Sequence, residues 1–232
     1  LAFARQSVLT LHSYRREAPA LQTQAEAAGA QEISRILGHG LLSKGFDIHH
    51  VFLFRRTGAF DAQPNTVFCS RERPRSPVAL VRMFIGLVRH LRALKPDVVV
   101  CFQHYGNVVG VLAAKLAGIR AVIINRNSDR SLIPGWVRGL ELAFALSGLF
   151  QRLVVNSASV EKEYAHCPKA YRSRVVRIDH GFETKTTSLS GGQARDLLSL
   201  PRDVTLLGSV GRLHRTKNFQ AAIRRLVGRA WP

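Results

Sequence analysis

The sequence predicts an α/β protein in which helices flank a Rossmann-like parallel sheet, followed by the first strand and helix of a second, incomplete Rossmann-like domain. Short runs rich in β-branched residues alternate along the chain with longer runs whose apolar residues recur at helical spacing. Residues 97–124 contain a complete strand–helix–strand unit, since the run VVVCF precedes a helix that stops at Gly118 and a second apolar run, AVII. Parallel strands require such crossovers.

The remaining elements follow in chain order. We expect strands at residues 7–12, 48–54, 97–102, 121–124, 152–155, 174–178 and 204–210. We expect helices at residues 29–45, 78–94, 108–117, 157–164 and 218–226. Gly29 opens the first helix and Gly45 closes it, Asn107 is a candidate N-cap, and Asn156 or Ser157 caps the fourth helix. Residues 13–28 are polar, contain proline, and are expected to form a loop.

A polar stretch containing Gly191 and Gly192 is the best candidate for a domain boundary. We therefore expect a first domain at residues 1–185, a linker at 186–202 and the start of a second domain at 203–232. The chain begins with Leu1 and ends six residues after the last expected helix, so we expect a fragment that lacks roughly 100–150 residues, the size of one domain.

The cysteines and the apolar runs exclude several classes of protein. Cys69, Cys101 and Cys167 are too scattered for a disulfide framework or a zinc site, and no metal site is expected. The opening residues lack the apolar run of a signal peptide, and arginines interrupt the longest apolar stretches, so we expect a cytoplasmic protein without a membrane-spanning helix.

The formal charge of +19 calls for an anionic partner, which could be nucleic acid, anionic lipid or a small anionic substrate. Residues 78–94 place apolar residues at helical spacing with arginines between them. Such a helix could lie on an anionic membrane surface, or it could pack on the core and expose a basic face. The sequence shows no recognised nucleic-acid-binding motif.

The strand-like run VTLLGSV leads directly into GRLHRTKN, which places Gly211, Arg212 and Lys217 between a strand and a helix. Gly211 permits close approach of the backbone to a ligand, and the two cations can meet a diphosphate beside the positive end of the helix. This arrangement predicts a phosphate-binding site.

The spacing Gly-Arg-Leu, three residues, Lys-Asn resembles the start of the donor-binding domain in family 4 glycosyltransferases of the GT-B fold. The resemblance continues upstream in the same order. EAAGAQEIS is similar to the family's small-residue loop, of which Gly29 is retained; VVNSASV matches its asparagine-serine step; and DHGFE (residues 179–183) resembles the turn before its interdomain linker.

This resemblance implies a retaining enzyme that transfers a sugar from a nucleotide sugar, held by Gly29, Gly211, Arg212 and Lys217, to a lipid-linked or polysaccharide acceptor. Polysaccharide or lipopolysaccharide biosynthesis is the implied setting, with no metal and no cofactor beyond the donor. The isolated fragment is expected to be inactive, because the family's pair of glutamates that binds the donor has no counterpart after Lys217.

Three residues are candidates for the catalytic centre. Several family members have a histidine after the strand equivalent to AVII, and here Arg126 or Asn127 stands at that place. A guanidinium can neutralise phosphate or sugar oxygens but cannot act as a base near neutral pH. His104 follows a strand at the carboxyl end of the expected sheet, where open α/β sheets bind ligands, although it could instead cap the next helix.

Two other interpretations remain open at this point. A basic nucleic-acid-binding protein would account for the arginine clusters, and a non-catalytic Rossmann-like module or pseudoenzyme would account for the early end of the second domain.

Overall fold

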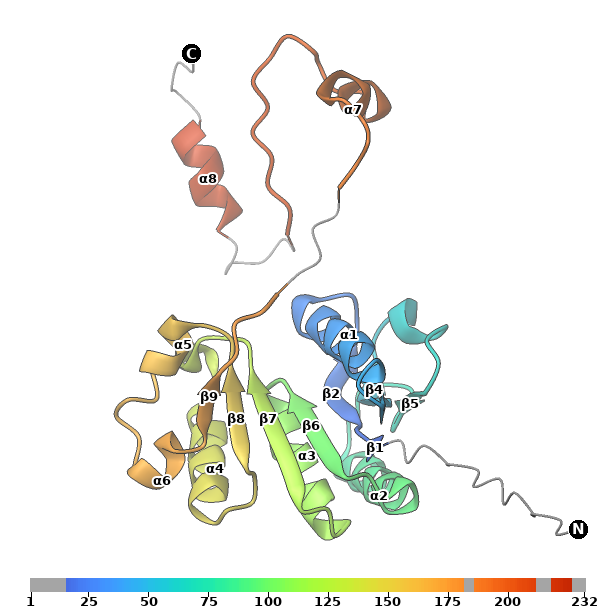
Figure 1. The fold of residues 1–232 in the computed structure, drawn as a ribbon, viewed down its shortest axis with the longest axis vertical. Helices are drawn as coiled ribbons and strands as arrows, with labels where there is room; N and C mark the ends of the chain where they lie inside the picture. Colours follow the sequence, from blue (N-terminus) through green and yellow to red (C-terminus); the bar gives the residue numbers. More distant parts are fainter. Residues whose placement is uncertain (1–15, 182–185, 212–217, 227–232) are drawn as a thin grey trace, which may run out of the picture. The chain divides into compact units, whose positions relative to one another are not determined.

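A parallel sheet of seven strands forms the centre of the first part of the chain (Figure 1). The computed structural model describes residues 16–181, 186–211 and 218–226, and the chain divides into two units between Phe182 and Glu183. In spatial order the strands are β5 (Thr66–Phe68), β4 (His50–Arg55), β2 (Ala20–Ala25), β6 (Val98–Phe102), β7 (Ala121–Arg126), β8 (Arg152–Val155) and β9 (Val175–Arg177). Two short strands, β1 (Arg16–Glu17) and β3 (Phe46–Asp47), pair separately.

Helices cover both faces of this sheet, as the sequence predicts. They are α1 (Gly29–Leu42), α2 (Pro77–Leu94), α3 (His104–Leu116), α4 (Gly135–Leu146), α5 (Ala158–Lys162) and α6 (Lys169–Arg172), with 3₁₀ turns η1 (Gly58–Phe60) and η2 (Arg130–Leu132). In Figure 1 α1 lies in front of the sheet and α3 behind it, and α2 and α4 pack against α3. The α/β class and the parallel sheet are confirmed.

The order of the strands reverses direction at β2. From β2 the chain builds outward through β4 to β5, and α2 then carries it back across the sheet to β6, on the other side of β2. The helices before and after this reversal lie on opposite faces, since every crossover between parallel strands has the same hand. The carboxyl ends of β2 and β6 therefore flank the point where the strand order reverses, which we call the crevice because folds of this type usually bind ligands there.

The central strand β2 lies within residues 13–28, so the expectation of a loop there was wrong. The side chain of Leu21 is fully buried, and so is that of Gln22, whose amide nitrogen donates to Ser34 Oγ of α1. This hydrogen bond offsets the cost of burying the amide, so a polar sequence (ALQTQA) occupies the middle of the sheet. The strand expected at residues 7–12 lies outside the described residues.

The other expected strands of the first unit are confirmed as β4, β6, β7, β8 and β9. The helix expected at residues 108–117 begins earlier, at His104, so the prediction that Asn107 caps it was wrong. Asn107 is 2% exposed, and its side-chain amide donates a hydrogen bond to the backbone carbonyl oxygen of Asn125, near the end of β7. Gly118 ends the helix in the left-handed conformation (φ 85°), as expected.

The main core lies between the sheet and the layer of α2, α3 and α4. Leu87, Leu91, Val122 and Phe150 are completely buried there. Close packing of α3 depends on Gly110, because a Cβ at this position would lie 2.5 Å from Cys101 Sγ on β6. One added methyl group at residue 110 would therefore make α3 clash with β6.

The second unit contains α7 (Gly191–Leu197) and α8 (Phe219–Leu226). Gly191 and Gly192, expected in a linker, instead form the first turn of α7, which Ser190 and Gln193 close with a capping box. Residues 204–210, expected as a strand, have no strand partner among the described residues, and Leu206, Leu207 and Val210 are exposed. Throughout the described ranges, no helix combines the length and the apolar character needed to cross a bilayer.

Replacing Gly110 by alanine should lower the free energy of unfolding by about 1–3 kcal/mol, because the added methyl group overpacks the α3–β6 contact. Urea denaturation followed by circular dichroism measures the change. Gly86→Ala in α2 is the matched control, since a Cβ there has no atom within 4 Å and alanine favours a helix by about 0.5–1 kcal/mol. Equal destabilisation by both substitutions would contradict the close-packing argument.

Candidate functional site

The crevice at the carboxyl edge of the sheet originates in a short ladder. Strand β2 pairs with β4 as far as Ala25 and Arg55, but its pairing with β6 ends at Leu21 and Cys101. Beyond that point the two strands separate, although both continue. The separation leaves backbone groups of β2 available to other partners at the place where the sheet changes direction.

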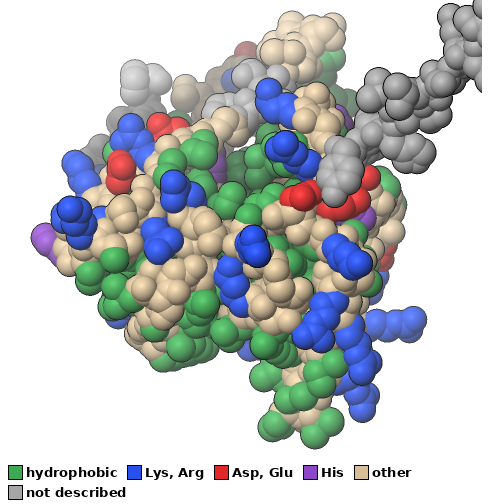
Figure 2. Space-filling view, turned by 60° about the horizontal axis from the view of Figure 1, so that its bottom comes forward, with side chains coloured by type: hydrophobic (Ala, Val, Ile, Leu, Met, Phe, Trp, Pro, Cys, Tyr) green, Lys and Arg blue, Asp and Glu red, His purple; other side chains and the backbone are tan. Residues whose placement is uncertain are grey.

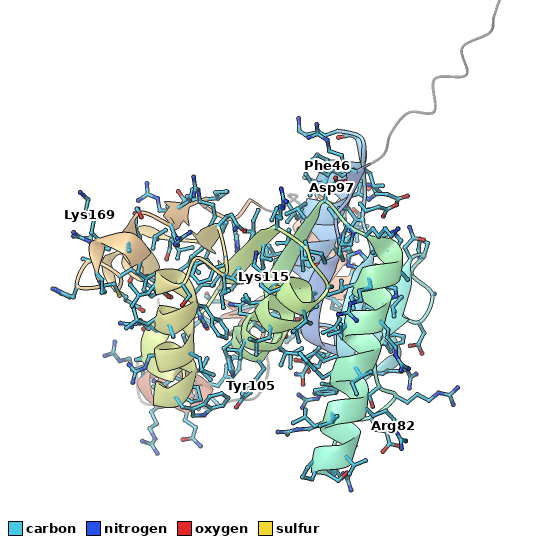
Figure 3. All side chains as sticks on the ribbon, turned by 90° about the horizontal axis from the view of Figure 1, so that it is seen from below. Phe46, Arg82, Asp97, Tyr105, Lys115 and Lys169 are labelled. Carbon is cyan, nitrogen blue, oxygen red and sulfur yellow. The ribbon has the colours of Figure 1, made fainter. Side chains whose placement is uncertain are left out.

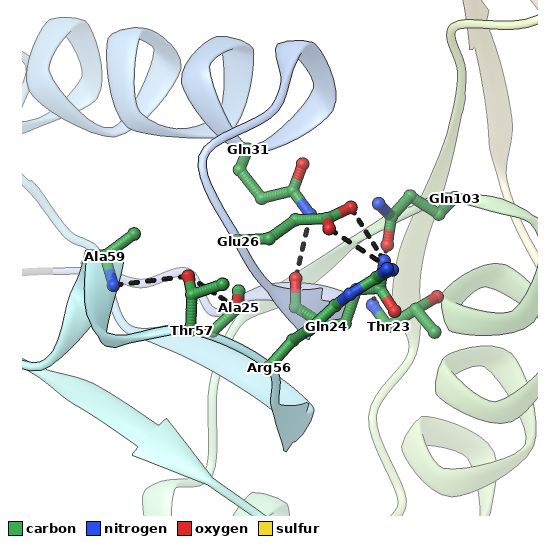
Figure 4. A network of polar contacts seen from close by, with 9 residues as sticks. All are labelled: Thr23, Gln24, Ala25, Glu26, Gln31, Arg56, Thr57, Ala59 and Gln103. Carbon is green, nitrogen blue, oxygen red and sulfur yellow. Dashed lines mark hydrogen bonds and ion pairs between the residues drawn. The ribbon is translucent and has the colours of Figure 1, made fainter. Parts of the chain in front are cut away.

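Gln103 fills the gap that the ladder leaves (Figure 4). Its side-chain oxygen accepts a hydrogen bond of 3.0 Å from the backbone N–H of Thr23, and the Thr23 hydroxyl accepts one of 3.0 Å from the N–H of Gly106. Gln103 has φ 65° and ψ 152°, a conformation that residues other than glycine rarely adopt. The strained residue immediately precedes His104 and fixes the direction in which α3 leaves the sheet.

On the other side of the crevice, α1 begins without a side-chain cap. Ala28 is its N-cap and makes no side-chain hydrogen bond, and Gly29 is its first residue. No protein atom lies within 4 Å of the position of a Cβ at Gly29. Packing therefore does not require glycine here, and the open space beside free helix amides suits an anionic group. Nearby, Glu26 pairs with Arg56 at 3.3 Å (Figure 4).

The side chain of Arg126 lies inside the protein. It is 1% exposed and forms an ion pair and hydrogen bond with Glu141 of α4, whose side chain is 5% exposed. Burial alone would lower the pKa of Arg126, but the Glu141 carboxylate raises it overall, so the guanidinium remains charged. The phenols of Tyr164 and Tyr171 lie in the same low-dielectric region, where burial raises the pKa of Tyr164 to about 12.

His104, Asn107, Arg126 and Glu141 line one recess, together with apolar residues of α3, α4 and β7. Burial lowers the pKa of His104, and the charge of Arg126 acts in the same direction against a smaller opposing effect of Glu141. The imidazole is therefore mainly neutral at pH 7, since the ordinary histidine pKa is about 6.5. A neutral imidazole can accept a proton or a hydrogen bond from a ligand.

Several buried carbonyl oxygens at this edge have no hydrogen-bond partner among the described residues. They belong to the side chains of Asn107, Asn125 and Asn127, which lie on α3 and at the end of β7. Buried polar atoms are normally satisfied by protein or by water, so these three oxygens remain available to accept a hydrogen bond. They lie on the elements that carry His104 and Arg126.

The structure thus brings three sequence candidates, His104, Arg126 and Asn127, to one edge of the sheet, together with Gly29 on α1 after β2. Arg126 faces Glu141 rather than solvent, so direct contact with a substrate is not available to it in this conformation. Gly211 is exposed in the second unit, and Arg212 and Lys217 lie outside the described residues. The roles of all these residues remain predictions.

Sequence reasoning missed Gln103 and Glu141. A glutamine before a helix carries no signal of positive φ, because this conformation is mostly reserved for glycine. Glu141 did carry a signal, as it is the only acidic residue in the apolar run from Ile133 to Phe150. An isolated charge on an otherwise buried helix face indicates a buried partner.

A different cluster lies at the opposite, amino-terminal edge of the strands. Among the described residues, Glu17, Asp47 and His49 are the group with ligand-type atoms within 4.8 Å of one another. His49 Nε2 lies 2.7 Å from Glu17 Oε2, and Asn65 donates to Asp47. These polar contacts hold β1, β3 and the start of β4 together. They lie at the opposite ends of the strands from the crevice.

The model of Glycosyltransferase Family 4 matches residues 28–186, which is more than half of the chain. The chain belongs to this family. The match covers the small-residue loop at Gly29, the strained turn at Gln103 and the buried pair of Arg126 and Glu141. A search of curated protein sequences finds no significant match.

Solved structures similar to this family 4 chain share its fold at low sequence identity. Sucrose-phosphate synthase from Thermosynechococcus elongatus has a TM-score of 0.66 and 15% identity, over 91% of this chain and 59% of that one. Anabaena HepE in complex with UDP and glucose has a TM-score of 0.60 and 14% identity, over 79% and 50%.

The lipopolysaccharide outer core galactosyltransferase WaaB has a TM-score of 0.57 and 12% identity, over 73% and 47%. The chain therefore spans about half the length of these structures. The family match shows membership of Glycosyltransferase Family 4, and these structures show that the chain shares the GT-B fold.

Breaking the buried ion pair should be costly. Glu141→Gln should lower the free energy of unfolding by about 3–5 kcal/mol, because it leaves the charge of Arg126 buried and uncompensated. The double variant Arg126→Met/Glu141→Leu should recover most of this loss, since it removes both charges and keeps the volume. Chemical denaturation measures both. A double variant as unstable as Glu141→Gln would show that packing, rather than the unpaired charge, causes the loss.

Proposed function

We propose that this chain supplies the acceptor-side domain, and the first elements of the donor-binding domain, of a retaining glycosyltransferase. The enzyme transfers a hexose from a nucleotide sugar to a lipid-linked or polysaccharide acceptor, in polysaccharide or lipopolysaccharide biosynthesis. The family match over residues 28–186, which includes the whole crevice, carries this proposal. Two of the similar structures support the donor and the setting: HepE contains UDP and glucose, and WaaB acts on the lipopolysaccharide outer core.

In this reaction the bond between the sugar's anomeric carbon and a donor phosphate oxygen breaks, and a bond to an acceptor hydroxyl oxygen forms. The acceptor proton passes to the departing diphosphate, which carries the developing negative charge. We assign neutralisation of that charge to Arg212 and Lys217. We assign a phosphate contact to the start of α1 at Gly29, where no side chain caps the helix. Neutralisation by cationic side chains requires neither a metal nor another cofactor.

His104 and Asn127 contact the reacting sugar or the acceptor in this proposal. The neutral imidazole of His104 can accept a hydrogen bond from a hydroxyl group, and the unpaired oxygen of Asn127 can do the same. We assign Arg126 to positioning, since its pairing with Glu141 holds the end of β7 against α4. Its charge also adds to the lowering of the His104 pKa that burial causes.

A second part of the proposal concerns the membrane. The first half of α2 projects from the body of the domain (Figures 2 and 3), and Val78, Val81 and Ile85 are exposed on it (68%, 56% and 44%). Arg82 and Arg89 lie on the same side of the helix, and no acidic residue occurs between Glu72 and Asp97. Mixed apolar and basic side chains suit the interface of an anionic bilayer. We propose peripheral binding to the inner face of the cytoplasmic membrane.

In the enzyme with a complete donor-binding domain, Arg212→Ala or Lys217→Ala should lower turnover roughly 10²–10³-fold, the effect of losing one preorganised electrostatic contact. Transfer from radiolabelled UDP- or GDP-sugars measures this loss. Arg215→Ala is the matched control, because it removes a cation from the same stretch of sequence, at a position outside the family spacing. The 232-residue chain alone should bind these donors weakly and transfer nothing.

Turnover unchanged in the Arg212 and Lys217 variants would contradict the phosphate assignment. Tight, stoichiometric donor binding by the 232-residue chain in calorimetry would contradict the division of labour between the two domains.

The protein should sediment with vesicles containing phosphatidylglycerol and stay in the supernatant with pure phosphatidylcholine. Arg82→Glu/Arg89→Glu should weaken vesicle binding roughly tenfold or more, because each basic side chain contributes about 1 kcal/mol near an anionic surface. Lys162→Glu/Lys169→Glu is the control with the same charge change on α5 and α6, and Lys169 lies far from Arg82 (Figure 3).

Equal loss in both double variants would indicate attraction by net charge alone. Preferential binding to DNA at physiological salt would point instead to a nucleic-acid partner.

A further inference from the structure

Two large aromatic side chains lie uncovered next to each other beside the candidate site. Tyr105, the second residue of α3, is 39% exposed, and Trp136, the second residue of α4, is 58% exposed. Their ring centroids are 6.1 Å apart with 35° between the ring planes, and the His104 ring centroid is 4.3 Å from that of Tyr105. We call Tyr105 and Trp136 the aromatic pair. Aromatic rings contribute most free energy to folding or binding when their surface is buried. The joint exposure of these two rings therefore indicates a surface for a ligand.

The aromatic pair stands on a rigid base. Next to Trp136, the side chain of Val137 is fully buried, and next to Tyr105 the N–H of Gly106 is tied to Thr23 of the central strand. Asn107, one turn into α3, is bonded to the carbonyl oxygen of Asn125. The start of α3 is thus tied to β2 and β7, and the buried Val137 anchors the start of α4, which reduces the entropy lost on binding.

A small recess adjoins the aromatic pair, and most of the side chains that line it are apolar. His104 and Asn107 line the adjoining recess, and the Asn107 side-chain oxygen is buried without a hydrogen-bond partner among the described residues. Asn107 itself is only 2% exposed. A site that joins aromatic surface to a few convergent polar groups suits a ligand that has both an apolar face and hydroxyl groups.

We propose that Tyr105 and Trp136 form a stacking site for a pyranose ring of the acceptor saccharide. One face of a pyranose presents C–H groups, which pack on aromatic rings, while its hydroxyls reach the tyrosine hydroxyl, the indole N–H and His104. The identity of this sugar as the acceptor rests on the proposed function. Its binding to the aromatic pair does not require a donor.

Other flat or apolar ligands fit less well. A nucleic-acid strand would need several free cations that follow its phosphates. Arg126 beside the pair is buried and engaged with Glu141, which leaves Arg138 as the one basic residue of α4 near the pair. A lipid chain would make no use of the histidine and the unpaired asparagine oxygen in the adjoining recess.

The experiment uses the fluorescence of Trp136. The chain has two tryptophans, so Trp231→Phe leaves Trp136 as the single indole. Titration of this variant with methyl β-glucopyranoside, methyl β-galactopyranoside and methyl α-mannopyranoside should change the emission saturably for at least one sugar. Tyr105→Ala in the same background should weaken that binding by roughly 2- to 12-fold, the value of one aromatic contact (about 0.5–1.5 kcal/mol).

Leu132→Ala is the matched control, because Leu132 is an exposed aliphatic residue four positions before Trp136 and should leave sugar affinity unchanged. The proposal is overturned if none of the three sugars changes the emission saturably, or if Leu132→Ala weakens binding as much as Tyr105→Ala. A response to phosphatidylcholine vesicles or oligothymidylate without a response to sugars overturns it as well. Because no donor is present, failure here is distinct from failure of transfer.

Discussion

The end of the β2–β6 ladder at Leu21 and Cys101 is the constraint on which the candidate site depends. If the two strands stayed paired to their carboxyl ends, the edge of the sheet would be closed by backbone hydrogen bonds. Instead, Gln103 supplies a side-chain oxygen to Thr23 in place of a strand partner and adopts a strained backbone conformation to do so. The crevice is therefore built into the sheet, and strain at Gln103 is the energetic cost of keeping it open.

The same constraint organises the charges behind the crevice. Because α3 and α4 begin at this edge, Arg126 at the end of β7 is covered by α4 and finds its counter-charge in Glu141. The Glu141 carboxylate raises the pKa of Arg126 despite its burial, so the guanidinium stays charged. Burial lowers the pKa of His104, and the charge of Arg126 adds to this effect. The protonation of His104 thus depends in part on the buried ion pair of Arg126 and Glu141, which is not itself exposed.

The sequence predicted those parts of the fold in which periodicity and burial agree. VVVCF and AVII are apolar throughout, and they form β6 and β7 as expected, because strands covered on both faces need no polar alternation. The central strand escaped prediction, since Gln22, Thr23 and Gln24 are typical loop residues. Only the structure shows that Ser34, Gln103 and Glu26, in that order, accept their hydrogen bonds. For the site, chain order located His104 and Arg126 at one edge. It could not show that Arg126 turns inward, because that depends on a glutamate on another helix.

The projecting half of α2 has a consequence for local stability. Ser76 caps it and Pro77 starts it, but Val78 and Val81 in its first turns are exposed, whereas Met83, Leu87 and Leu91 further along are buried. A helix without tertiary cover is held by its own hydrogen bonds, which are marginal over so short a length. Amide hydrogen exchange should therefore be faster in the first turns of α2, which can open on their own. It should be slower in the last turns, which open only together with the sheet. Any partner that covers Val78 and Val81 would slow exchange at amides it never touches, because the first turns would then open only together with the rest of the helix.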